Sequence, residues 1–267
     1  LVRAEGGIRP LPASRHPRFF SKDLMKKYGI PTAKYETFDD PAKVMEYIKA
    51  EGKYPVVIKA DGLALGKGVL ICENEEQAAE GVKEIMLDKK FGASGNHVVV
   101  EEFLTGPEVS VLSFTDGKVV KPMVSSMDHK RANDHDTGLN TGGMGAYSPV
   151  PQIGQDVIDT AIETIVKPTV QAMADEGTPF TGILYAGLIA TADGPKVIEF
   201  NARFGDPETE VVLPKLTSDL GAGINAILNG ETPEFTWDED NATLGVVIAS
   251  EVTRPTWSRV PRFLRSR

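Results

Sequence analysis

The segment EFNARFGDPE, residues 199–208, holds the strand end and the turn from which the fold can be predicted. The residues before it read as a strand, so Glu199 and Asn201 lie two residues apart at its end and face the same side. A carboxylate and an amide oxygen are hard ligands that suit Mg²⁺. Arg203 continues in phase with this pair and could meet an anion, while Asp206 could cap a helix or orient a substrate amine. A plain strand end with a surface acid and a helix cap is the alternative, and it leaves the phase of Arg203 unexplained.

Outward from this segment, turn signals and periodicity predict alternating strands and helices. Two hairpins are predicted, turning at Asp116-Gly117 and at Asp193-Gly194. Further strands are expected over 55–60, 69–72, 98–102 and 243–250, and helices over 21–28, 41–51, 74–86, 155–176, 207–213 and 220–228. Hairpins mixed with helices favour an α+β fold over a purely parallel, doubly wound sheet.

A glycine-rich segment, KADGLALGKG at residues 59–68, lies between two predicted strands. Its glycines allow the backbone amides to approach phosphates closely, and Lys59 and Lys67 add positive charge on either side. The spacing matches neither a Walker A loop nor a dinucleotide fingerprint. A hairpin turn with solvated lysines remains the alternative interpretation.

Acidic residues follow the predicted strand that ends near Glu101. Residues 101–108, EEFLTGPE, then change direction. A strand end can offer backbone hydrogen bonds to an adenine edge, and an acid can accept hydrogen bonds from ribose hydroxyls. A strand-to-turn junction with ordinary surface acids would have the same sequence.

Residues 125–148 are predicted to form one long, polar, glycine-rich loop. It contains DHKR at 128–131 and NTGGMG at 140–145. Long loops without secondary structure are uncommon in compact domains and are often functional, and exposed backbone amides suit a carboxylate or a phosphate. His129 and His135 are interpreted as non-ligands, because no third ligand type accompanies them.

Composition excludes several classes of protein. The chain has 267 residues, a net charge of −9 and a single cysteine, Cys72, so neither a disulfide framework nor a multi-cysteine metal site is expected. The negative charge argues against a broad nucleic-acid surface. No apolar run approaches the length of a membrane span.

Basic residues are distributed unevenly along the chain. Residues 21–251 hold 20 basic and 37 acidic residues, whereas residues 1–20 and 252–267 carry net charges of +3 and +5 through nine arginines. Either the ends are basic tails for an acidic partner, or they are foreign to the domain. We favour foreign ends, because lysine gives way abruptly to arginine and proline.

Together these segments resemble the ATP-grasp ligases, and within them the phosphoribosylamine–glycine ligases of purine biosynthesis. The resemblance covers roughly residues 20–250. It is carried by the lysine and glycine-rich segment at 59–68, by DHKR with NTGGMGAY at 128–147, and by EFNARFGDPE. It implies an ATP-grasp fold in which two α+β subdomains hold ATP between them.

The resemblance also implies a role for each matching residue. Phosphates would meet Lys22 and Lys59, adenine would meet the backbone of Glu101 and Phe103, and the ribose would meet Glu108. The full nucleotide set adds Gly62, Gly66, Lys67 and Gly68. Glu199 and Asn201 would hold Mg²⁺ or Mn²⁺; many relatives have a further metal carboxylate about a dozen residues earlier, where this chain has Gly187. Substrates would meet Asp128, Lys130, Arg131, Asn140, Thr141, Gly142, Gly143, Met144, Gly145 and Asp206.

The implied reaction is the ligation of glycine to 5-phosphoribosylamine with consumption of ATP. A glycyl phosphate would form first, and the amine would then displace phosphate to give glycinamide ribonucleotide. Lys59 and Arg203 would neutralise charge at the γ-phosphate, and closure of the 59–68 segment would bring the reactants together. A cytoplasmic monomer that binds small molecules, without nucleic acid or membrane, is expected.

The same resemblance divides the chain into expected parts. A main subdomain would comprise residues 21–38 and 109–236, and a lid subdomain residues 39–108. The family has a further domain before this core and another after it. Residues 1–20 would be a remnant or non-native segment, residues 237–251 the start of a truncated C-terminal domain, and residues 252–267 a foreign tail, so an internal fragment of uncertain activity is expected.

Other functions fit parts of the pattern. Another ATP-grasp carboxylate–amine ligase would share the chemistry, and a non-catalytic Mg-ATP-binding module would share the fold. An adaptor could instead bind acidic partners through its arginine-rich ends.

Overall fold

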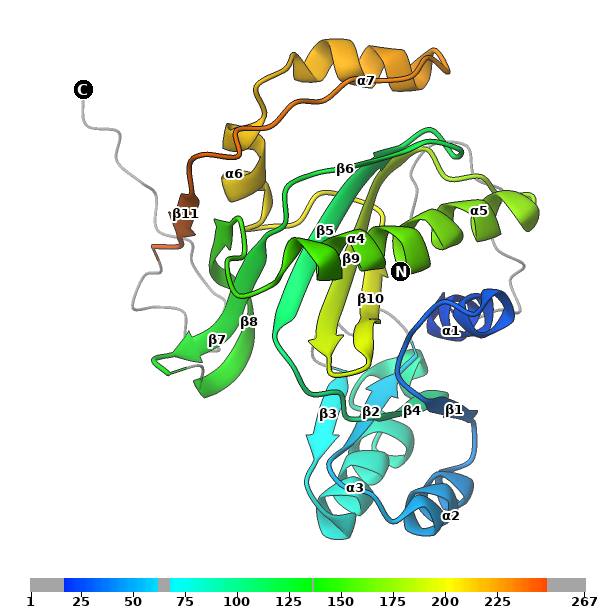
Figure 1. The fold of residues 1–267 in the computed structure, drawn as a ribbon. Coiled ribbons are helices and arrows are strands. Elements are labelled where there is room, and N and C mark those ends of the chain that lie inside the picture. Colours follow the sequence, from blue (N-terminus) through cyan, green and yellow to red (C-terminus); the bar gives the residue numbers. More distant parts are fainter. Residues whose placement is uncertain (1–16, 62–67, 136, 249–267) are drawn as a thin grey trace.

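The computed structural model describes residues 17–61, 68–135 and 137–248 of the chain. In these ranges two four-stranded sheets and one three-stranded sheet combine with helices (Figure 1). Antiparallel sheets packed with helices confirm the predicted α+β class. None of the helices in these ranges is long and apolar enough to cross a membrane.

The first sheet is antiparallel and has the strand order β1-β4-β2-β3. Its strands are β1 (Tyr35–Phe38), β2 (Val56–Ala60), β3 (Val69–Cys72) and β4 (Val98–Glu102). Helices α2 (Pro41–Glu51) and α3 (Glu75–Val82), with the π-helical turn η1 (Lys83–Leu87), contribute to one apolar core with this sheet, and a 3-10 turn, η2 (Gly92–Gly95), precedes β4. The Asp40 side chain accepts a hydrogen bond from the backbone amide of Ala42, and Gly52, with φ 60°, ends α2, which confirms the predicted helix.

The first sheet includes residues that the sequence had suggested for the main subdomain. β1 pairs with β4 from Tyr35 opposite Glu101 to Phe38 opposite Val98. The sheet therefore begins at Tyr35, whereas the expected lid subdomain began at residue 39. Four residues of alternating character gave no signal of which sheet they would join.

The main sheet has the antiparallel order β10-β9-β5-β6. Its strands are β5 (Glu108–Thr115), β6 (Val120–Pro122), β9 (Gly182–Thr191) and β10 (Gly194–Asn201). Both predicted hairpins are confirmed. At the first turn, the Asp116 carboxylate accepts hydrogen bonds from the amides of Lys118 and Val119, the latter at 2.6 Å.

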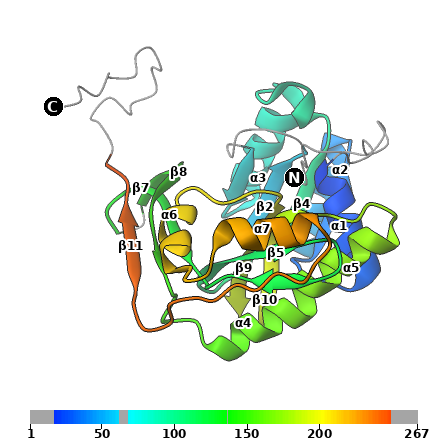
Figure 2. The same ribbon diagram turned by 90° about the horizontal axis from the view of Figure 1, so that it is seen from above.

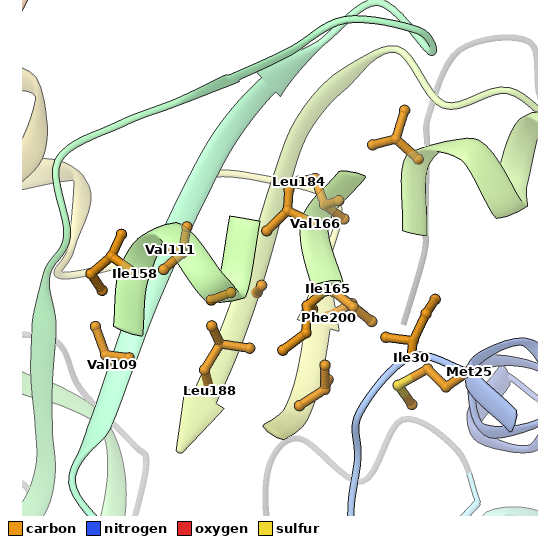
Figure 3. Close-up of a cluster of buried hydrophobic side chains, with 14 of the residues drawn as sticks. Met25, Ile30, Val109, Val111, Ile158, Ile165, Val166, Leu184, Leu188 and Phe200 are labelled. Atoms are coloured by element: carbon orange, nitrogen blue, oxygen red, sulfur yellow. The ribbon is translucent and has the colours of Figure 1, made fainter. Parts of the chain in front are cut away.

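Helices cover one face of the main sheet, which we call the helical face (Figure 1). They are α1 (Pro17–Tyr28), α4 (Gln155–Ala161) and α5 (Lys167–Asp175), with a π-helical turn, η3 (Ile162–Val166), between the last two. Leu188, Val111 and Ile165 are fully buried between these layers (Figure 3). Alternation along each strand sends the next side chains to the other face, which we call the second face.

The second face is covered in part by the chain that follows β10. Val211 and Val212 of α6 (Thr209–Val212) and Ile227 of α7 (Leu220–Leu228) pack there with Leu112 and Phe114 of β5. A 3-10 turn, η4 (Leu213–Lys215), separates the two helices. The remainder of the second face carries the polar residues described below.

A third sheet contradicts the prediction of a long loop over residues 125–148. β7 (Met127–Asn133) and β8 (Thr137–Ser148) form an antiparallel ribbon, and β11 (Thr243–Val246) pairs with β8. Figure 2 shows this sheet on the side of the molecule away from α1 and α5. Its pairing depends on backbone hydrogen bonds, and the polar, glycine-rich sequence has no apolar alternation from which strands could be predicted.

Two predicted boundaries were also wrong. α1 begins at Pro17, four residues before the predicted start at residue 21. The last strand ends at Val246, earlier than the predicted residue 250.

Candidate active site

A buried carboxylate between two lysines connects α1 with the first sheet. Lys22 Nζ lies 3.2 Å from Glu101 Oε1, and Lys59 Nζ lies 2.8 Å from Glu101 Oε2. The side chains of Lys22, Lys59 and Glu101 are only 6%, 8% and 5% exposed. Two ammonium groups and one carboxylate therefore lie together in a site with little water.

Strand register explains how two of these groups meet. Val57 lies opposite Glu101 in the β2–β4 pair, and Lys59 follows Val57 by two residues, so its side chain is on the same face as Glu101. Lys22 belongs to α1, and its ammonium group also donates a hydrogen bond to Thr32 Oγ1 at 2.8 Å. Burial by itself would raise the pKa of Glu101, but the two lysines outweigh it and hold that pKa below its ordinary value.

The remaining predicted nucleotide residues are only partly described by the structure. Gly62, Gly66 and Lys67 lie outside the described residues. Gly68 begins the return to β3, and its carbonyl oxygen accepts a hydrogen bond from the Ala60 amide at 2.8 Å. Phe103 is exposed just beyond β4.

A polar row crosses three strands on the second face of the main sheet. Glu199 of β10 lies opposite Gly187 of β9, and Gly187 lies opposite Ser110 of β5. One step along, Asn201 lies opposite Tyr185. Glu199 and Asn201 are therefore in neighbouring rows on one face, and Gly187 leaves space beside Glu199 that a side chain would occupy.

A small pocket collects charged residues from three strands at this row. Its lining includes Glu108, Asp128, Lys130 and Glu199. Lys130 Nζ lies 3.4 Å from Glu108 Oε2 and 3.5 Å from Asp128 Oδ2. Burial would lower the pKa of Lys130, but the carboxylates of Glu108, Asp128 and Glu199 outweigh it and raise that pKa, so the ammonium stays charged.

Beneath the pocket lies a buried network that the sequence did not predict. Tyr185 donates a hydrogen bond to Glu208 Oε1, Ser110 donates to the same oxygen at 3.3 Å, and Ser110 Oγ lies 2.8 Å from the Tyr185 hydroxyl. Burial raises the pKa of Glu208, against the hydrogen bond from Tyr185 that lowers it. Burial and the Glu208 charge raise the pKa of Tyr185. Only the position of Glu208 at the end of EFNARFGDPE hinted at a role.

The β7–β8 ribbon meets the turn after β10, which joins two segments predicted to bind substrate. A Cβ built on Gly143 would lie 2.3 Å from Cδ of Pro207, next to Asp206, and Gly143 has φ +132°. Within the ribbon, the Thr141 hydroxyl donates to the Lys130 carbonyl oxygen, and Arg131 Nη1 donates to the Gly138 carbonyl oxygen, both at 2.8 Å. Asn140 lies opposite Arg131, and the Met144 carbonyl oxygen accepts a hydrogen bond from Val247.

Arg203 and Asp206 lie beyond the strand. β10 ends at Asn201, so the alternation that was expected to continue to Arg203 stops there. The Arg203 guanidinium donates to the carbonyl oxygen of Phe204 at 2.7 Å, and both Arg203 and Asp206 are exposed. α6 begins at Thr209, and no side chain caps it.

Metal-binding potential in this region rests on oxygen ligands. His129 stacks on Tyr147, with ring centroids 5.7 Å apart. Across the described residues, no group of three or more His, Cys, Asp or Glu side chains is arranged to hold a metal ion. A metal at Glu199 and Asn201 would therefore need further ligands from a substrate or water, as Mg²⁺ commonly has.

Comparisons with known proteins show the family of the chain. Residues 17–209 match the family described as phosphoribosylglycinamide synthetase, ATP-grasp (A) domain. Phosphoribosylamine–glycine ligases of Streptococcus pyogenes and Streptococcus pneumoniae are 54% and 53% identical over 250 residues, which is 94% of this chain and 59% of theirs. The crystal structure of the Thermotoga maritima phosphoribosylamine–glycine ligase is 34% identical, with a TM-score of 0.83 over 90% of this chain and 60% of that one. The chain thus spans about three fifths of the length of these relatives.

We predict that Glu101→Gln lowers the free energy of unfolding by about 3 kcal/mol, because two buried lysines lose their shared counter-charge. Glu102→Gln, at the exposed neighbouring position, should cost less than about 1 kcal/mol. Chemical denaturation at pH 7 measures both. Equal effects would show that the buried ion pairs contribute little.

The lowered pKa of Glu101 predicts that its contribution to stability depends on pH. Since folding lowers the pKa of Glu101, its ionised form stabilises the fold above the ordinary value of 4.5, and this contribution is lost as the pH falls below it. The difference in stability between wild type and Glu101→Gln should therefore shrink as unfolding is repeated from pH 7 to pH 3. A constant difference would contradict the lowered pKa.

Gly143→Ala should destabilise the ribbon by about 1–3 kcal/mol, because φ +132° disfavours a side chain and Pro207 occupies its space. Gly142→Ala is the matched control, since a Cβ there would meet nothing within 4 Å. Thermal unfolding followed by circular dichroism compares them. Equal unfolding temperatures would mean that Gly143 and Pro207 are not in contact.

Proposed function

The chain belongs to the phosphoribosylglycinamide synthetase ATP-grasp (A) domain family, and on that premise we propose that it catalyses the ATP-dependent ligation of glycine to 5-phosphoribosylamine. The products are glycinamide ribonucleotide, ADP and phosphate, which places the reaction in purine biosynthesis. The observation that most supports this function is the buried Lys22–Glu101–Lys59 triad, which holds two ammonium groups in place where phosphates would bind. As proposed, the chain acts on small molecules as a cytoplasmic monomer.

ATP binds, in this proposal, between the first sheet and the second face of the main sheet. Lys22 and Lys59 bind phosphate oxygens, and Glu101 fixes both ammonium groups in place beforehand. The backbone of Glu101 and Phe103 binds adenine at the end of β4. Glu108, exposed at the start of β5, accepts hydrogen bonds from the ribose.

Glu199 and Asn201 hold the divalent cation, Mg²⁺ or Mn²⁺. Their hard oxygen atoms lie in adjacent rows of one sheet face, and Gly187 leaves room beside Glu199 for other ligands. The cation, when bound, would neutralise charge on the phosphates.

The reaction then needs two displacements, and the protein supplies charge and position for both. In the first, a glycine carboxylate oxygen forms a bond to the γ-phosphorus while the bond to the bridging β,γ oxygen breaks, which releases ADP. In the second, the amine of phosphoribosylamine forms a bond to the carbonyl carbon, phosphate leaves, and the amine loses a proton. Lys59 and Arg203 stabilise the negative charge of the first step.

The third sheet and the turn after β10 position both acceptor substrates. Arg131, Lys130 and Asp128 come from β7, and the backbone of 140–145 comes from β8. Gly143 packs against Pro207, so this backbone and Asp206 are adjacent. Their proximity supports one substrate site made from both segments.

Lys59→Ala should weaken Mg-ATP binding at least about tenfold, because a charge-assisted contact to phosphate is lost. Lys90→Ala should change it less than about twofold, since Lys90 is exposed and pairs with Glu84. Isothermal titration calorimetry measures both, and Glu199→Ala should also weaken binding through the cation. Equal effects of the two lysine substitutions would exclude Lys59 from the phosphate site.

ADP production should require both glycine and phosphoribosylamine. A coupled assay with each substrate omitted in turn, and with other amino acids in place of glycine, tests this. Mg-ATP binding without such turnover would indicate a nucleotide-binding module, and turnover with a different acid and amine would indicate another carboxylate–amine ligase.

A further inference from the structure

Among the residues that the structure describes, Lys130 is the only lysine that lines the pocket on the second face, which we call the acidic pocket. Its ammonium lies 3.4 Å from Glu108 and 3.5 Å from Asp128, and Glu199 lines the same pocket. The Asp128 side chain is only 6% exposed, while Lys130 is 38% exposed. A nearly buried carboxylate needs a nearby counter-charge, and Lys130 is in position to supply it.

Charge balance in this pocket is unfavourable without Lys130. Three carboxylates on β5, β7 and β10 would repel one another across a small space, and each would attract any cation from solution. The ammonium reduces both tendencies. Asp128 and Lys130 are also two residues apart on β7, so this compensation is built into one strand.

We propose that Lys130 is the internal counter-ion of this pocket, a positioning residue that holds Glu108, Asp128 and Glu199 together and excludes free divalent cations until nucleotide binds. The proposal rests on the proposed function, because it takes Glu199 as a ligand of the nucleotide-bound metal. It adds an order of binding: the metal enters with the triphosphate and not before it.

The order of binding follows from the balance between repulsion of the cation by Lys130 and its attraction to the nucleotide phosphates. A free divalent cation must approach Glu199 against the positive charge of Lys130, with few protein ligands to compensate for lost water. The phosphates of a nucleotide bring ligands and several negative charges, which outweigh the single ammonium. Lys130 therefore makes metal binding conditional on nucleotide.

The proposal can be tested by measuring the affinity of the nucleotide-free 267-residue chain for Mn²⁺. Electron paramagnetic resonance gives the concentration of the free ion. Lys130→Met should tighten Mn²⁺ binding about tenfold, because one positive charge is removed near the ligands. Lys130→Arg keeps the charge and should bind Mn²⁺ like wild type, and so should the control Lys43→Met on the exposed side of α2. Unchanged or weaker binding in Lys130→Met, or equal changes in the Met and Arg variants, would overturn it.

A measurement on wild type keeps the test decisive if Lys130→Met does not fold. After subtraction of the Mn²⁺ that the analogue binds by itself, wild type should bind Mn²⁺ at least about tenfold more tightly with a non-hydrolysable ATP analogue than without it. Equally tight binding without the analogue would overturn the proposal. Failure of the analogue itself to bind, seen by calorimetry, would instead count against the proposed function, and the nucleotide-free comparison of variants would still decide the role of Lys130.

Discussion

The buried contact of Glu101 with Lys22 and Lys59 is the constraint on which the proposed site depends. It joins α1, which packs in the core of the main sheet, to β2 and β4 of the first sheet. One carboxylate therefore connects the two parts of the structure. Removing three charged groups from water is costly unless they pair closely. The pairing also fixes the positions of two ammonium groups, which the proposed function uses to bind phosphate oxygens. Stability and ligand preference therefore come from the same three side chains.

Because side chains alternate along its strands, the main sheet has the hydrophobic core on its helical face and the polar row on its second face. Val109 and Val111 of β5 face the helices, while Ser110 between them faces the polar row with Gly187 and Glu199. A β-bulge between Val197 and Glu199 adjusts the end of β10, so that Val197 and Phe200 are both in the core while Glu199 is exposed. The buried apolar residues of β5 and β10 thus fix the positions of the polar residues that alternate with them.

Sequence predicted those features that depend on local chemistry. The hairpins at Asp116 and Asp193 and the helix from Pro41 carry their own turn and cap signals, and the phase of Glu199 and Asn201 follows from alternation. The ribbon over 127–148 was missed because its strands are specified by backbone pairing between polar segments. Glu208 was missed because its partner Ser110 lies 98 residues away in the sequence. The roles assigned to the site residues remain predictions.

The glycines of NTGGMG show why a motif has to be divided into its separate physical demands. Gly143 and Gly145 have φ +132° and +159°, and a Cβ on either would collide, with Pro207 or with the carbonyl oxygen of Gly245. Packing against the turn after β10 and against β11 is enough to require glycine at both positions, whatever binds there. Gly142 faces open space, and neither its backbone nor its neighbours require the absence of a side chain. If any glycine of this segment is needed for the approach of a substrate, Gly142 is the one that packing leaves unexplained.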